Sequence, residues 1–175
     1  MDFHGVLRSL AEFLEREGHP FALAGAFGLQ SYGLPRATID LDLVTDAAAQ
    51  PRVIAFLESL GYETLHRSAG YSNHLHPRSA MGRVDFIYVR GETSRQLFAG
   101  ARRRALLPDL EVPVLRPEHL VAMKVQAIRN DPQRRHQDMA DLAFLLQLPD
   151  IDQDAVREYF ARHGMVSDYE LLRRS

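Results

Sequence analysis

The sequence has no cysteine among its 175 residues, which excludes disulfides, thiolate metal sites and cysteine nucleophiles. It also lacks any apolar run near the roughly 18 to 20 residues that a membrane-spanning helix needs, so we expect no membrane partner. The first residues, MDFHGVLRSLAEFLEREGH, carry acidic side chains throughout and show no cleavage site, unlike a secretory signal. We therefore expect a cytoplasmic protein.

A strong charge of one sign is also missing. The formal net charge is −2, so the chain as a whole is not attracted to nucleic acid. Basic residues nevertheless gather in short clusters: Arg102, Arg103 and Arg104; Arg134, Arg135 and His136; and Arg173 and Arg174. Each cluster is explained by a solvated surface or a chain end, and the alternative is contact with a polyanionic acceptor.

Helical and strand periodicities alternate in the first part of the chain, and only helical patterns follow. Strands are predicted around residues 21–24, 39–44, 63–66, 72–76, 83–89 and 112–115, and helices from residue 117 onward. We expect an α/β (α+β) protein with a small mixed sheet flanked by helices. Residues 1–115 would form the α/β core, and residues 116–175 a helical part packed on that core as one structural unit.

Two aspartates, Asp40 and Asp42, lie inside an apolar run that reads as a strand. Side chains alternate along a strand, so these carboxylates are predicted on one face, with Ile39, Leu41 and Leu43 on the other. Two carboxylates so close repel each other and resist desolvation unless a positive charge lies between them. A divalent cation is the obvious candidate.

Asp85 is a third carboxylate in an apolar strand, RVDFIYV. If the two strands are neighbours, Asp40, Asp42 and Asp85 can converge on one point. Mg²⁺ and similar cations prefer oxygen ligands, and two such ions can support phosphoryl transfer. The alternative is that each aspartate only ends a strand or pairs with a nearby arginine.

Gly25 and Ala26 follow a strand and open a predicted helix. Glycine permits a tight turn and lets a phosphate approach the backbone, where the helix start supplies free N–H groups. Glycine also ends many strands for packing reasons alone. Its place just before the strand of Asp40 and Asp42 favours the phosphate interpretation.

Together these residues resemble the signature of the polymerase-β-like nucleotidyltransferase superfamily: a glycine motif at a helix start, D-x-D on the next strand and a third aspartate on a later strand. The linking segment YGLPRATID (residues 32–40) is similar to the AbiEii-type branch, as is the pairing of EHLVAMK (residues 118–124) with RHQDMADL (residues 135–142). The resemblance covers residues 21–146. It implies a nucleotidyltransferase fold and activity.

The resemblance implies a role for each matching residue. Asp40, Asp42 and Asp85 would bind Mg²⁺ or Mn²⁺, with Asp85 alternatively taking the proton of the acceptor hydroxyl. The NTP would be bound by Gly25, Ala26, Arg36, Thr38, Lys124, Asp138 and Asp141. One departure is Ala26, which stands where the family has Gly or Ser and offers no hydroxyl contact.

Other interpretations remain open for several of these side chains. Asp138 and Asp141 share one helix face, which a solvated surface explains as well as a site does. Lys124 could snorkel past apolar neighbours, and Arg36 could be an exposed loop residue. A metal site at His74 and His76 is disfavoured, because no third ligand lies nearby.

The predicted activity is transfer of an NMP from an NTP to an acceptor hydroxyl, with release of pyrophosphate. The AbiEii resemblance implies the toxin of a toxin–antitoxin pair, with RNA (such as tRNA) or protein as acceptor and an antitoxin protein as partner. The alternatives are transfer to a small antibiotic, or a non-catalytic nucleotide-binding module that kept the fold. The sequence leaves open the preferred base, the acceptor, the antitoxin and the oligomeric state.

Overall fold

A computed structural model of the protein describes residues 3–107 and 109–174. The chain divides into two compact units between Leu115 and Arg116. Within the described ranges, no helix is long and apolar enough to cross a membrane.

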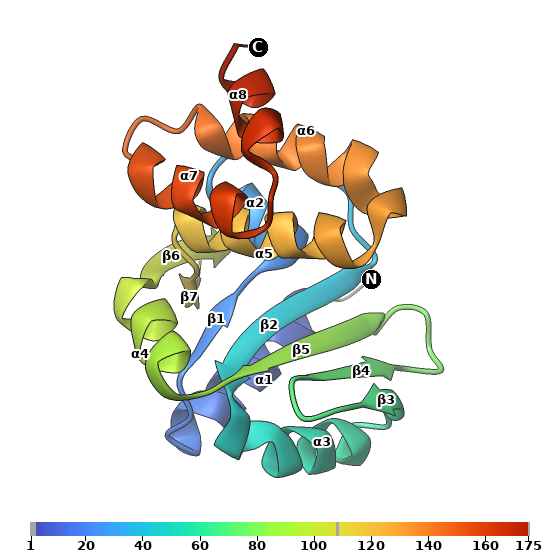
Figure 1. Ribbon diagram of the computed structural model, residues 1–175. Coiled ribbons are helices and arrows are strands. Elements are labelled where there is room, and N and C mark those ends of the chain that lie inside the picture. Colours follow the sequence, from blue (N-terminus) through green and yellow to red (C-terminus); the bar gives the residue numbers. More distant parts are fainter. Residues whose placement is uncertain (1–2, 108, 175) are drawn as a thin grey trace. The chain divides into compact units, whose positions relative to one another are not determined.

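The first unit is built on a mixed seven-stranded sheet with strand order β3-β4-β5-β2-β1-β7-β6 (Figure 1). This confirms the predicted α/β fold class. The strands are β1 (Phe21–Leu23), β2 (Asp40–Asp46), β3 (Glu63–Arg67), β4 (Tyr71–Leu75), β5 (Arg83–Val89), β6 (Arg102–Leu107) and β7 (Leu110–Val114).

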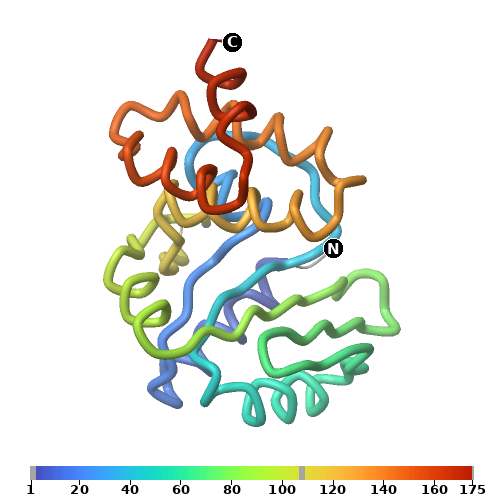
Figure 2. Tube along the Cα trace, viewed as in Figure 1, coloured from blue at the N-terminus to red at the C-terminus, as the bar shows by residue number. Residues whose placement is uncertain are grey.

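Strand pairing brings together segments that are far apart in the sequence (Figure 2). Strand β2 pairs antiparallel with β1 and parallel with β5, and β1 pairs parallel with β7. The sequence predicts one strand around residues 112–115, and the structure has two strands before Leu115, β6 and β7, paired antiparallel. The sheet is therefore larger than predicted.

The helices of this unit cover the apolar side chains of the sheet. Leu7 and Leu10 from the first helix and Leu57 from the third pack with Leu43 and Phe86 in one core cluster, each at most 1% exposed. Burial of these side chains on one face leaves the alternate residues of β2 and β5 on the other. The helices are α1 (Phe3–Arg16), α2 (Gly25–Ser31), the 3₁₀ turn η1 (Ala47–Ala49), α3 (Gln50–Ser59) and α4 (Gly91–Gly100).

The second unit is entirely helical within its described residues. Pro117 occupies the first turn of its first helix, where the missing N–H costs nothing. Asp152 caps a later helix by accepting hydrogen bonds from the backbone N–H groups of Asp154 and Ala155. The helices are α5 (Pro117–Asn130), the 3₁₀ turn η2 (Pro132–Arg134), α6 (Arg135–Leu146), α7 (Gln153–Arg162) and α8 (Val166–Arg174).

Candidate active site

Strand β2 presents Asp40 and Asp42 on one face and Leu41 and Leu43 on the other. Both leucines are fully buried, and both aspartates are partly exposed. The predicted alternation therefore holds from Asp40 onward. Ile39 departs from the prediction: the strand begins one residue later, and Ile39 is 75% exposed instead of buried with the leucines.

Thr38 fixes the first aspartate of the D-x-D pair. Its hydroxyl donates a hydrogen bond to the Asp40 carboxylate, and the Asp40 carbonyl lies 3.1 Å from the same oxygen. This contact orients Asp40 at the start of β2. The proposed nucleotide contact of Thr38 stays a prediction.

Gly25 packs directly against the carboxylate of Asp42. A Cβ atom at Gly25 would lie 1.8 Å from Asp42 Oδ2, and the φ of Gly25 is +53°, which L side chains rarely adopt. The Ala24 N–H also donates to the Asp42 carbonyl at 3.0 Å. The glycine motif and the D-x-D strand therefore form one local structure, and no other residue fits at Gly25.

Asp85 on β5 lies opposite Asp42 on β2, because the two strands are parallel neighbours in that register. In the same register Arg83 lies opposite Asp40. Asp85 is 6% exposed, and the Arg83 Nε donates to its Oδ1 at 2.8 Å. The sequence leaves two interpretations open for Asp85, a carboxylate that faces another aspartate or one that pairs with an arginine. In the structure Asp85 does both.

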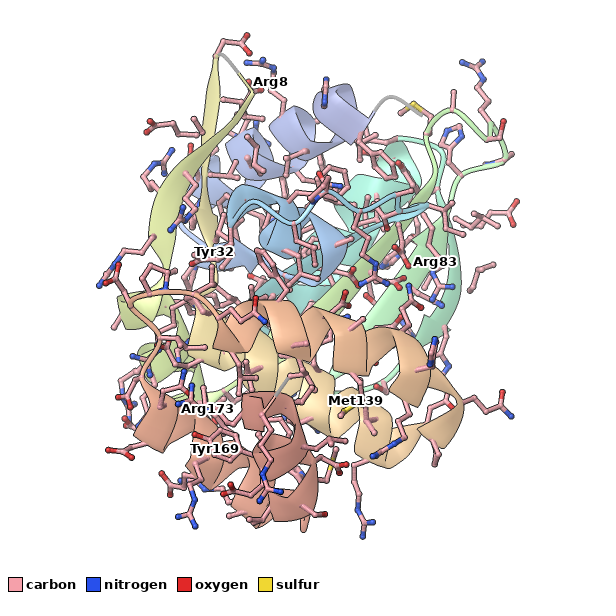
Figure 3. All side chains as sticks on the ribbon, turned by 90° about the horizontal axis from the view of Figure 1, so that it is seen from above. Arg8, Tyr32, Arg83, Met139, Tyr169 and Arg173 are labelled. Atoms are coloured by element: carbon pink, nitrogen blue, oxygen red, sulfur yellow. The ribbon has the colours of Figure 1, made fainter. Side chains whose placement is uncertain are left out.

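Tyr71 on β4 completes this contact network. Its hydroxyl accepts a hydrogen bond from Arg83 Nη2 at 3.2 Å and donates one to Asp85. Burial, and next the charge of Asp85, raises the pKa of Tyr71 to about 12, so the hydroxyl keeps its proton at neutral pH. In Figure 3 Arg83 is labelled beside the strands coloured green, apart from Tyr32.

Asn73 on β4 lies opposite Asp85 on the side away from Asp42. Its side-chain oxygen is buried and has no hydrogen-bond partner among the residues that the structure describes. Arg83, Tyr71 and Asn73 are site residues that the sequence interpretation missed. Arg83 lies two residues before Asp85 on the same face of β5, which the sequence does show. The register that puts Tyr71 and Asn73 beside Asp85 depends on strand pairing.

The carboxylates suit a divalent cation in donor chemistry and register, although they are not gathered around one point. Within the described ranges, no group of three or more His, Cys, Asp or Glu side chains is arranged to hold a metal ion. Asp40 is turned to Thr38 and Asp85 to Arg83. Asp42 and Asp85 nevertheless face each other across the strand pair, and carboxylate oxygens are the ligands Mg²⁺ prefers.

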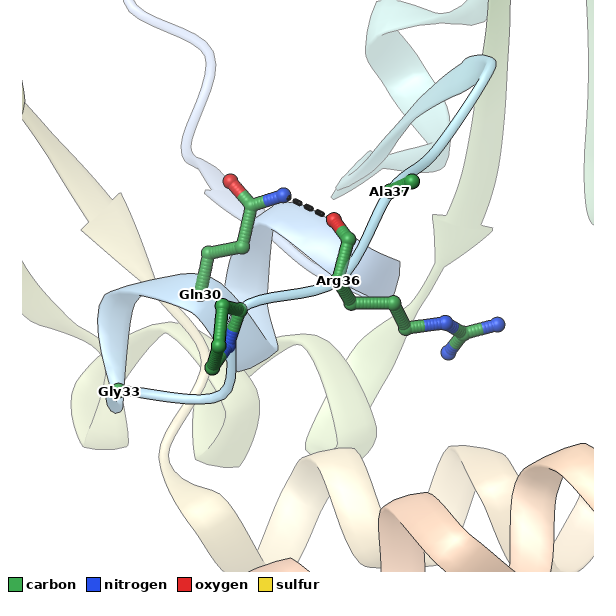
Figure 4. A pocket seen from close by; sticks show the side chains of 5 residues that line it. Gln30, Gly33, Arg36 and Ala37 are labelled. Carbon is green, nitrogen blue, oxygen red and sulfur yellow. Dashed lines mark hydrogen bonds between the residues drawn. The ribbon is translucent and has the colours of Figure 1, made fainter.

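Arg36 lies in the loop between α2 and β2, beside a shallow hollow of about 680 Å³. Gln30 Nε2 donates to the Arg36 carbonyl at 2.6 Å, and the Arg36 guanidinium extends away from Gln30 (Figure 4). Its predicted contact with nucleotide stays a prediction. The hollow is lined by Gln30, Gly33, Pro35, Arg36 and Ala37.

In the second unit Lys124 is paired with both predicted aspartates. Its Nζ lies 2.6 Å from Asp138 Oδ1 and 2.6 Å from Asp141 Oδ2. All three residues are buried, with at most 8% exposed. A solvated face therefore does not explain Asp138 and Asp141, and Lys124 does not snorkel to solvent. Their nucleotide-binding role stays a prediction.

The two histidines of the disfavoured metal hypothesis do not form a pair. His74 is fully buried, where its Nε2 lies 2.8 Å from Ser72 Oγ and its Nδ1 lies 3.1 Å from Thr64 Oγ1. His76 lies beyond the end of β4, and its Nδ1 accepts a hydrogen bond from the Arg78 backbone.

The basic cluster of β6 does not present one continuous basic surface. Arg103 pairs with Glu15 at 3.0 Å. Arg104 stacks 4.0 Å from the centre of the Tyr32 ring and donates to the Ser31 carbonyl. Two of the three arginines are therefore held by contacts within the chain.

The cluster at the start of α6 is also held by contacts within the chain. Arg134 lies 3.3 Å from Asp138, and Arg135 pairs with Asp168. Attraction of a polyanion to these two arginines would have to compete with those carboxylates.

Several solved structures share this fold at low sequence identity. One is a lincosamide antibiotic adenylyltransferase, LnuA, 16% identical over 81% of this chain and 94% of that chain, with a TM-score of 0.59. Another is the antibiotic-resistance factor ANT(2'')-Ia, 14% identical over 99% and 91%, with a TM-score of 0.60. A nucleotidyltransferase-like protein of Paracoccidioides brasiliensis is 18% identical over 97% and 91%, with a TM-score of 0.57. The fold is thus that of the nucleotidyltransferases.

A family model narrows this class. The model of the AbiEii nucleotidyl transferase toxins of type IV toxin–antitoxin systems matches residues 82–175. The chain belongs to the AbiEii nucleotidyltransferase family, so the predicted family and the predicted enzyme class are confirmed. No curated protein matches the chain.

Proposed function

We propose that this protein transfers an NMP from an NTP to a hydroxyl group of RNA in a reaction that depends on a divalent cation, and that it is the toxin of a toxin–antitoxin pair. One observation carries the catalytic part of the proposal. Gly25 lies against Asp42, and Asp42 lies opposite Asp85, so the glycine motif meets the second and third aspartates at one place.

Each of these residues has a distinct role in the proposed reaction. Asp40 and Asp42 hold Mg²⁺ or Mn²⁺, which when bound neutralises charge on the reacting phosphate. Gly25 leaves the backbone open to the triphosphate, and the Ala26 N–H is the next donor. Asp85 supplies the third carboxylate beside the acceptor hydroxyl. The protein contributes positioning and charge, as transfers of this type require.

The toxin role rests on the family. The matched family is described as toxins of type IV toxin–antitoxin systems, and an antitoxin protein is the partner that such a role requires. Expression of the chain alone should arrest growth of a host, and expression of Asp42→Asn should not. Normal growth with active wild-type enzyme would remove the toxin role and leave the transferase intact.

Transfer to a small antibiotic is the second candidate. Two of the solved structures with this fold are named for antibiotic modification or resistance. In that case the acceptor would be a lincosamide- or aminoglycoside-like hydroxyl instead of RNA.

The catalytic proposal is tested by joint binding of NTP and Mg²⁺. A ligand at about a hundred times its Kd stabilises the native state by roughly 2.7 kcal/mol, so the melting temperature should rise clearly with both and little with either alone. Asp42→Asn should remove this rise. Asp46→Asn is the matched control, because Asp46 lies on the same strand but accepts from Ala48 and Ser94.

The acceptor is tested by supplying labelled NTPs together with total RNA, a lysate protein pool, and aminoglycosides and lincosamides. We expect label on RNA. Label on the antibiotics alone would favour the second candidate and contradict the toxin role.

A further inference from the structure

The strand order of the sheet puts Gly25 and Asp85 on opposite sides of Asp42. The helix that starts at Gly25 follows β1, and the strand order continues as β1, β2, β5 and β4. Gly25 therefore lies on the β1 side of Asp42, while Asp85 and then Asn73 lie on the other side. The inference below rests on the proposed function, in which the triphosphate binds on the Gly25 side.

In-line phosphoryl transfer puts the attacking and leaving oxygens on opposite sides of the phosphorus atom. Pyrophosphate departing on the Gly25 side requires the acceptor hydroxyl to approach from the side of β5 and β4. The side chains that β4 places on this face, among them Tyr71 and Asn73, therefore lie where an acceptor must bind.

These side chains offer three different kinds of contact. Tyr71 offers an aromatic ring, on which a base of any identity can stack. Asn73 is half-buried on the same face, and its side-chain amide can hydrogen-bond a ribose hydroxyl or a base.

Arg83 supplies the charge. Its side chain is 37% exposed, and Nε and Nη2 are held by Asp85 and Tyr71. A guanidinium has five N–H donors, so a head group fixed at two of its nitrogens can still donate to a phosphate. Strand β4, with the sequence YSNHL, carries no carboxylate that would attract a cationic drug.

We propose that Tyr71, Asn73 and Arg83 form the acceptor subsite, and that it binds the terminal nucleotide of a single-stranded RNA whose hydroxyl reaches Asp85. Tyr71 stacks on the base, the amide of Asn73 hydrogen-bonds the ribose or base, and Arg83 contacts the adjacent phosphate. A polycationic aminoglycoside would meet Arg83 and no acid on β4.

The test measures binding of a fluorescein-labelled eight-nucleotide RNA with a free 3′ hydroxyl, by anisotropy, with Mg²⁺ and a mixture of non-hydrolysable NTP analogues. Arg83→Gln should weaken binding about tenfold and lower the log–log salt slope by about 0.7, the value of one phosphate contact on a single strand. Tyr71→Ala should weaken binding by a similar factor, whereas Tyr71→Phe should keep most of it. Asn73→Ala should weaken binding several-fold.

Arg52→Gln is the matched control. Arg52 also pairs with a carboxylate, that of Glu17, but it lies on α3, which packs on the opposite face of the sheet. Its loss removes the same charge and should leave RNA binding unchanged. Arg83→Lys keeps the positive charge and should recover part of the binding, which separates loss of a phosphate contact from general damage near Asp85.

Two failures are distinguishable. If the wild-type protein shows no joint stabilisation by NTP and Mg²⁺, the proposed function is wrong. If that stabilisation is present but the RNA binds Arg83→Gln and Tyr71→Ala as tightly as Arg52→Gln, or the wild type binds no RNA, the acceptor subsite is wrong. Tighter aminoglycoside binding by Arg83→Gln with no RNA binding by the wild type would assign the subsite to the antibiotic.

Discussion

In the second unit Asp138 and Asp141 share one lysine, whereas in the first unit Asp42 and Asp85 face each other and Asp85 is paired with Arg83. Lys124 lies 2.6 Å from both of its aspartates, and all three residues are buried. Asp42 is partly exposed and packs against Gly25. Two buried carboxylates thus share one lysine in one unit, whereas in the other unit Asp85 is paired with Arg83 and Asp42 keeps part of its surface exposed.

The difference follows from solvation. A charge that is fully removed from water must be paired and hydrogen-bonded by the protein. A charge at a partly exposed sheet surface keeps part of its hydration and can exchange it for a metal ion. The buried cluster is therefore expected to govern stability, and the partly exposed Asp42 to govern chemistry.

Breaking the buried cluster should have the largest effect. Lys124→Met removes the cation that pairs with both buried carboxylates, and loss of one partner of a buried ion pair costs about 3–5 kcal/mol. The free energy of unfolding, measured in urea, should fall by that amount, and the joint NTP and Mg²⁺ stabilisation should shrink. A loss under about 1 kcal/mol would show that the cluster is not structural, and an unchanged ligand response would remove Lys124 from the nucleotide site.

Gly25→Ala should come next. The added Cβ would lie 1.8 Å from Asp42 Oδ2, at a φ of +53°. Strain at such a backbone position costs about 1–3 kcal/mol, and Asp42 must move. We expect a lower melting temperature together with loss of transfer. As a control, Gly33→Ala has a positive φ but no atom within 4 Å, so it should lose stability and keep activity.

Asp42→Asn should separate stability from activity. Like charges opposite each other on paired strands are destabilising, so removing one should leave the metal-free protein as stable or up to about 1 kcal/mol more stable. Transfer should be lost because a cation ligand is gone. A variant that loses stability and keeps activity would show that the aspartate is structural.

A smaller effect should appear in the pH dependence of stability. Burial, and next the charge of Arg116, lowers the pKa of His119 from 6.5 to about 4. The unfolded chain therefore takes up a proton that the folded chain does not, and stability falls as the pH drops from 6.5 to about 4, by at most about 1.4 kcal/mol per pH unit. His119→Leu should flatten this slope in acid titrations of unfolding, and the exposed His136→Gln should not.

In the first unit His74 should affect the pH dependence of stability in the same direction as His119. Burial lowers its pKa below the ordinary 6.5, so its contribution to stability is also lost as the pH falls below that value.

Much of the site could be predicted from local pattern. Asp40 and Asp42 alternate with leucines, and this pattern predicts a strand with both carboxylates on one face. The spacing of Asp138 and Asp141 required one helix face. The resemblance of these motifs to the AbiEii branch gave the family, which the family model confirms.

Other features could not be predicted, because they depend on which strands pair and in what register. The parallel pairing of β2 with β5 puts Asp42 opposite Asp85 and Arg83 opposite Asp40. The pairing of β4 with β5 adds Tyr71 and Asn73. Ile39 was assigned to the apolar face because the sequence does not show where β2 begins.

The sequence by itself therefore determined the elements, the faces on which their charges lie and the family, since side-chain periodicity is a property of a single strand or helix. Only the tertiary structure decided which charges meet. It gave Lys124 to Asp138 and Asp141, and it brought both Gly25 and Asp85 to Asp42. These contacts join residues on different helices and strands. Burial of the apolar faces, which no single segment encodes, sets the strand register that brings Asp42 and Asp85 together.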